Sequence, residues 1–75
     1  MNIKELIKRE APYDDPHDRA YAAALRSSYK FYKHMNLDAL KTGYHIATTN
    51  FDSSHKLTAD CVVLYELIKE KNQGQ

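Results

Sequence analysis

The sequence has little of the glycine from which many enzyme sites are built. Glycine occurs at Gly43 and Gly74 and nowhere else. A phosphate-cradling loop, a dinucleotide-binding fingerprint or a nucleophile elbow needs several glycines at fixed spacing, so all three are excluded. A chain of 75 residues also has little volume for a pocket that shields a substrate from water. We therefore expect a protein with no enzymatic activity and no cofactor.

Cysteine, long apolar runs and an excess of one charge are scarce as well. Cys61 is the single cysteine, so no disulfide can form within the chain, and one free thiol fits a reducing compartment. No stretch is apolar enough for a secretory signal or a membrane span, which predicts a cytoplasmic protein without membrane contacts. The net charge of +1 is not the basic excess of a typical nucleic-acid-binding domain. Electrostatic arguments therefore depend on local clusters of charge.

Apolar residues recur at three- and four-residue steps, which predicts an all-α fold in a single domain, residues 1–75, built as a small bundle of three or four helices. The expected helices span about residues 2–10, 16–35, 37–48 and 54–71. A frayed polar tail at residues 72–75 is expected to follow them. Asn2, Asp15 and Asn36 are favourable N-cap residues for the first three helices. Residues 44–51 are rich in strand-forming side chains, so a strand there is the alternative.

The helix expected at residues 16–35 has one basic side and one apolar side. Its basic side carries a row of cations along the helix, with Ala22 among the cations and Tyr29 at the border. Such a row can follow phosphates while a tyrosine stacks on a base, or it can meet an acidic protein. A solvated helix face is the simpler interpretation. The row consists of Arg19, Arg26, Lys30 and Lys33, and the apolar stripe consists of Ala20, Tyr21, Ala24, Leu25, Ser28, Phe31, Tyr32 and Met35.

The helix expected at residues 54–71 carries more apolar surface than a helix at the edge of a bundle needs. Its arc holds Leu57, Cys61, Leu64, Tyr65, Leu67 and Ile68, widened on both sides by Val62 and Val63. Either this helix is central in the bundle, or part of the arc meets a second chain. If it meets a second chain, the candidate residues for self-association are Leu57, Val62, Val63, Tyr65 and Leu67.

Histidines and carboxylates raise the possibility of a metal site. His17 stands among Asp14, Asp15 and Asp18, but acidic residues are also expected at a helix N-terminus, and the spacing matches no EF-hand loop and no HExxH pair. The remaining histidines, His34, His45 and His55, lack the short paired spacing of zinc ligands. Cys61 lies inside an apolar arc and is expected to be a buried core residue. We therefore expect no bound metal.

These observations favour a small regulatory or protein-interaction module that forms a homodimer through its last helix. Nucleic-acid binding through Arg19, Arg26, Tyr29, Lys30 and Lys33 is the first alternative. A metal-dependent activity that uses His17 and the neighbouring aspartates is the second. A short chain rich in lysine and glutamate is also typical of small bacterial or phage-borne proteins, which is an expectation about source and not about function.

Overall fold

The chain folds into an all-α bundle, as the periodicity predicts. The computed structural model describes the backbone of residues 1–49 and 55–73, and the side chains of residues 1–49 and 58–73. The described part contains four helices and no strand: α1 (Ile3–Glu10), α2 (Pro16–Tyr32), α3 (Leu37–Thr49) and α4 (His55–Gln73). Residues 44–49 are helical, so the strand alternative is wrong there, and residues 50 and 51 lie outside the described part.

Side-chain caps begin the first three helices at the expected residues. The Asn2 side chain accepts hydrogen bonds at the start of α1, and Asp15 Oδ1 accepts from the Asp18 backbone N–H at 2.7 Å at the start of α2. Asn36 Oδ1 accepts from the Ala39 backbone N–H at 2.8 Å at the start of α3. Each cap satisfies a backbone donor that has no partner within its helix. The predicted break near Asn36 is confirmed.

Two helix ends differ from the prediction by two residues or more. α2 ends at Tyr32 and not at residue 35, because the chain turns there and the Met35 backbone N–H donates to the Tyr32 carbonyl. α4 continues through Gln73, so residues 72 and 73 are helical although the prediction assigned them to a frayed tail. The rest of that tail, Gly74 and Gln75, lies outside the described residues. The end of α2 is followed by neither proline nor glycine, the residues that stop a helix most clearly, whereas the end of α4 comes directly before Gly74 in the sequence.

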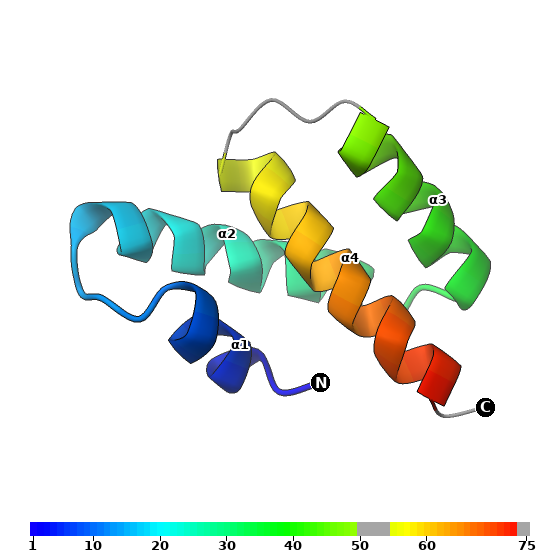
Figure 1. Cartoon of the computed structure of the whole chain (residues 1–75), viewed down its shortest axis with the longest axis horizontal. Coiled ribbons are helices and arrows are strands. Elements are labelled where there is room, and N and C mark those ends of the chain that lie inside the picture. The colour runs from blue at the N-terminus through cyan, green and yellow to red at the C-terminus, as the bar shows by residue number, and fades with distance from the viewer. Residues whose placement is uncertain (50–54, 74–75) are drawn as a thin grey trace.

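α4 is the central helix of the bundle. It crosses α2 and packs along α3, while α1 packs on α2 (Figure 1). Arg9 of α1 and the Met1 amino group just before α1 form ion pairs with Glu66 and Glu70 of α4. The wide apolar arc is therefore largely explained by burial within one chain. The molecule measures only 37 × 26 × 16 Å. One side of the central helix remains uncovered, because Tyr65 near its middle is 55% exposed. The core consists of Leu6, Leu25, Leu40, Ala47, Ala59, Val63, Leu64 and Leu67.

The buried side of α2 is rotated from the predicted stripe. Leu25 and Ser28 are buried and Arg26 and Lys30 are exposed, as the two-sided helix requires. Ala22, placed among the cations, is instead buried, because it lies beside Ile7 and Ala11 where α1 packs on α2. Conversely, Ala20 is exposed, and the Phe31 side chain is 67% exposed although both were assigned to the apolar stripe.

Gly43 lies inside α3 where the helix approaches α2 and α4. A Cβ atom built there would be 3.5 Å from Leu64 Cδ2 and 3.6 Å from Tyr32 Cε1, which is ordinary van der Waals contact. We expect Gly43→Ala to raise the free energy of unfolding by about 0.5–1 kcal/mol, because alanine loses less backbone entropy in a helix. Urea denaturation followed by circular dichroism measures this. A destabilised alanine variant would show that the helices cannot accommodate one methyl group.

No helix in the described part of the chain combines the length and the apolar character needed to cross a bilayer.

Candidate functional site

The uncovered side of α4 is centred on Tyr65. This side chain is 55% exposed, although its neighbours Leu64 and Glu66 turn toward the core and toward α1. The Tyr65 ring lies 6.4 Å from the Tyr44 ring of α3, with the two planes tilted by 44°. Aromatic pairs at this separation attract each other. We call the surface formed by Tyr44, Cys61, Val62, Tyr65 and Ile68 the Tyr65 face.

Two surface hollows flank Tyr65 along the axis of α4. Toward the C-terminal end of the helix, Ile68 and Asn72 line a hollow of about 480 Å³. Toward the N-terminal end, Cys61 and Val62 line a hollow of about 390 Å³, and both hollows share the two tyrosines. The Tyr65 ring is therefore exposed between two hollows, and tyrosine is a residue type that is enriched at protein-contact surfaces.

The two hollows carry opposite charges at their rims. Lys41 and Lys69 border the C-terminal hollow. Arg9, Glu10 and Glu66 border the N-terminal hollow, where Arg9 donates to Glu66 at 3.0 Å and lies 3.8 Å from Glu10. The hydrogen bond to Glu66 raises the pKa of the Arg9 guanidinium. One cation against two carboxylates leaves this rim negative, so charge changes sign from one side of Tyr65 to the other.

Cys61 is half-buried on this face and not in the core, which corrects the prediction. Burial, and secondly the negative charge of Asp60, raise the pKa of its thiol. A raised pKa lowers the thiolate fraction near neutral pH, and the thiolate is the nucleophile. These surroundings are therefore the opposite of those that activate a catalytic cysteine.

The residues predicted for self-association separate into two groups. Val63 and Leu67 are buried inside the bundle, at 0% and 5% exposure, and cannot contact a second chain. Val62 is half-buried and Tyr65 is exposed, and both belong to the Tyr65 face. The Leu57 side chain lies outside the described residues. The wide arc is therefore divided between the interior of the bundle and one outward strip.

The predicted basic row is shorter than expected. Arg19 Nε donates to Asp14 Oδ1 at 2.9 Å, so this cation is paired. Lys33 Nζ lies 5.6 Å from the centre of the half-buried Tyr29 ring, a cation–π geometry that engages the ring which was expected to stack on a base. Arg26 and Lys30 are exposed, and neither forms an ion pair with a described residue.

Three of the predicted metal-ligating residues come together at the start of α2. Ligand atoms of Asp15, His17 and Asp18 lie within 4.8 Å of one another. Asp15 caps the helix, however, and Asp18 Oδ2 accepts from the Tyr13 backbone N–H at 2.8 Å, so the carboxylates have structural partners. Asp14 is turned toward Arg19. Within the described residues, this is the single group of that kind, and neither His34, His45 nor Cys61 belongs to it.

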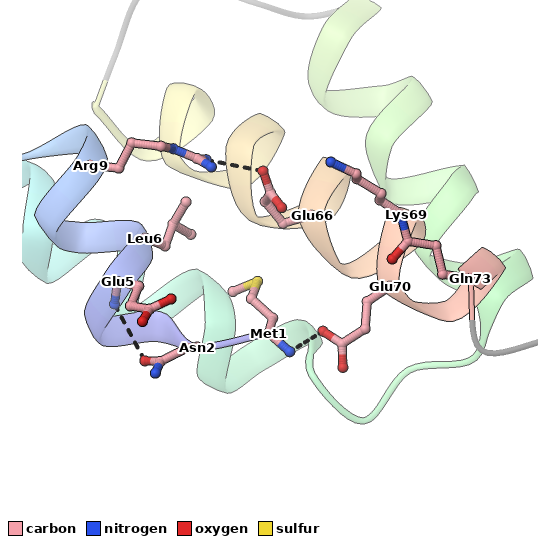
Figure 2. Close-up of a pocket in the computed structure, with 9 residues that line it drawn as sticks. All are labelled: Met1, Asn2, Glu5, Leu6, Arg9, Glu66, Lys69, Glu70 and Gln73. Carbon is pink, nitrogen blue, oxygen red and sulfur yellow. Dashed lines mark hydrogen bonds and ion pairs between the residues drawn. The ribbon is translucent and has the colours of Figure 1, made fainter.

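A further surface hollow of about 560 Å³ lies between α1 and α4. Figure 2 shows Leu6 between two ion pairs, one from Arg9 to Glu66 and the other from the Met1 amino group to Glu70. Leu6 is buried and belongs to the core. These contacts fasten the short helix α1 onto α4, which is the packing that a helix of eight residues needs. We assign this hollow a structural role.

A buried polar pair lies on the other side of α4. The Ser28 hydroxyl donates to Asp60 Oδ1, and both residues are buried where α2 packs on α4. The sequence prediction did not single out Asp60. Its position between apolar residues of α4, opposite a serine on the apolar stripe of α2, is the signal that marks such a pair.

No protein family, curated protein or solved structure matches the chain, so its own residues carry the functional argument.

Proposed function

We propose that this protein is a non-enzymatic interaction module that forms a homodimer through the Tyr65 face. The observation that carries the proposal is an exposed tyrosine at the centre of the central helix, between two hollows with opposite rim charge. Large exposed aromatic side chains of this kind are typical centres of protein contacts. The alternative functions, which rest on the basic row and on the His17 cluster, use residues that are already partly engaged by Asp14, Tyr13 and the α2 backbone.

The distribution of charge supports a second copy as the partner. In a two-fold symmetric dimer the same surface occurs on both sides of the interface. If the symmetry axis passes near Tyr65 and the two α4 helices run antiparallel, the lysine-bordered hollow of one copy faces the glutamate-bordered hollow of the other. Lys41 and Lys69 then approach Glu10 and Glu66 of the second copy. Opposite charges at the rim favour this register over a parallel one.

Replacing Tyr65 with serine tests the proposal. Because the side chain is 55% exposed, its loss should leave the helical content unchanged. The dimer dissociation constant should rise at least about tenfold, as expected for a central aromatic residue. Sedimentation equilibrium from micromolar to millimolar chain concentration measures the dimer dissociation constant of the wild-type chain and of the Tyr65→Ser variant.

Tyr13→Ser provides the matched control, because Tyr13 is 73% exposed and lies outside the Tyr65 face. This variant should dimerise like the original chain. Arg26→Glu with Lys30→Glu should also dimerise normally, since the basic row is on another helix. A wild-type chain that stays monomeric throughout, or equal loss in the Tyr13 and Tyr65 variants, would refute dimerisation through this face.

A further inference from the structure

Asp60 is a buried carboxylate that has no cationic partner among the side chains of residues 1–49 and 58–73. The residue is 8% exposed, and the Ser28 hydroxyl donates a hydrogen bond to its Oδ1 atom. No Lys, Arg or His in the described part of the chain forms an ion pair with it. Buried carboxylates usually have a cation nearby, because removing a charge from water is costly. Asp60 therefore has capacity for one more partner.

Asp60 lies at a surface groove, and its second carboxylate oxygen is not fully enclosed. Among the described side chains, every fully enclosed polar atom has a hydrogen-bond partner. Since the Ser28 hydroxyl bonds to Oδ1, Oδ2 must still reach the surface. Asp60 indeed lines a groove of about 490 Å³ between α2 and α4. The described residues that line it are Ala24, Ser27, Ser28, Phe31, Tyr32 and Asp60.

Aromatic rings form one wall of this groove. Phe31 is 67% exposed, and its ring meets the Tyr32 ring edge-on with centres 4.9 Å apart. Burial, and secondly the charge of Asp60, raise the pKa of the Tyr32 hydroxyl, so the carboxylate acts on this wall. An aromatic wall beside a carboxylate suits a cation on an apolar stem, because the ring faces attract the cation and contact the stem.

We propose that this groove, the Asp60 groove, binds a lysine or arginine side chain presented by a partner protein. The cationic head would pair with Asp60 Oδ2, while Ser28 holds Oδ1, and the aliphatic stem would lie against Phe31. The Asp60 groove is independent of the Tyr65 face, since Asp60 precedes Tyr65 by five residues, which is about 140° of rotation around α4. A chain that dimerises could therefore also hold a basic segment of a different protein.

Titration of the ¹⁵N-labelled chain with short peptides tests this assignment. The probes are acetylated and amidated pentapeptides of glycine with one central lysine, arginine or norleucine. We expect the two basic peptides to shift the backbone amide signals of Ala24, Ser27 and Phe31, and the norleucine peptide to shift none of them. Asp60→Asn should weaken binding of the basic peptides at least tenfold. Asp38→Asn removes a carboxylate at the exposed start of α3 and should leave binding unchanged.

Phe31→Ala provides a second test if Asp60→Asn does not fold, because the exposed Phe31 ring contributes little to the core. It should weaken the basic peptides several-fold. Equal binding of the norleucine peptide, peptide shifts confined to other surfaces, or unchanged affinity in both variants would overturn the proposal. The proposal would also be overturned if the backbone amide signals of the groove shifted with chain concentration in the absence of peptide. The groove would then be occupied by a second copy of the chain.

Discussion

Replacing Leu64 with alanine should remove about 2–5 kcal/mol from the free energy of unfolding. Leu64 is fully buried on α4, and its methyl groups face Gly43 of α3. At about 0.05–0.15 kcal/mol per residue, the whole chain has only about 4–11 kcal/mol of stability. The truncation therefore costs a large part of the total. Urea denaturation followed by circular dichroism at 222 nm, the standard helix signal, measures the loss.

Tyr65→Ala is the matched control for this truncation. It removes a larger side chain from the adjacent residue, but one that is 55% exposed. At a chain concentration below the dimer dissociation constant, it should therefore change the free energy of unfolding by less than about 1 kcal/mol. If the two alanine variants were equally stable, α4 would not be the central helix in solution.

Replacing Ser28 with alanine should destabilise the chain by about 1–3 kcal/mol, although only one hydroxyl is lost. The variant leaves the buried Asp60 carboxylate without its donor, and an unpaired buried charge is more costly than a missing hydrogen bond. Adding Asp60→Asn to Ser28→Ala should recover part of this loss, because a neutral amide costs less to bury. Chemical denaturation of the two single variants and the double variant gives the coupling free energy.

Ser27→Ala is the control for the serine substitution, because Ser27 is the exposed neighbour on the same helix. Its effect should stay within about 0.5 kcal/mol. A Ser28→Ala chain as stable as the Ser27→Ala chain would show that Asp60 finds another donor or remains hydrated. The Asp60 carboxylate would then be more accessible to water than its 8% exposure in the structure indicates.

The Tyr65 face and the Asp60 groove are separate surfaces for which we propose two kinds of contact. The face offers an exposed tyrosine with rims of opposite charge, which favours a copy of the same chain. The groove offers a single buried carboxylate beside aromatic rings, which favours a basic side chain. Because each has its own variant, Tyr65→Ser and Asp60→Asn, failure of one proposal leaves the other testable.

Helix starts were predictable because they depend on nearby residues. Asn2, Asp15 and Asn36 each supply a side-chain oxygen to a backbone N–H two or three residues later, a contact that is local in sequence. The two-sided character of α2 was predictable as well, because the periodicity of apolar residues is also local in sequence. As predicted, Leu25 is buried and Arg26 is exposed. Local hydrogen bonds and a 3.6-residue period require no knowledge of neighbouring helices.

Tertiary packing decided which part of each apolar arc was buried. Val63 and Val62 are adjacent and chemically identical, yet Val63 is in the core and Val62 lies on the Tyr65 face. Phe31 is exposed and Ala22 buried because α1 and α4 cover α2 from directions that periodicity does not specify. The pairing of Ser28 with Asp60 joins residues 32 positions apart. A wide arc allows several rotations of a helix, and only the neighbouring helices select one.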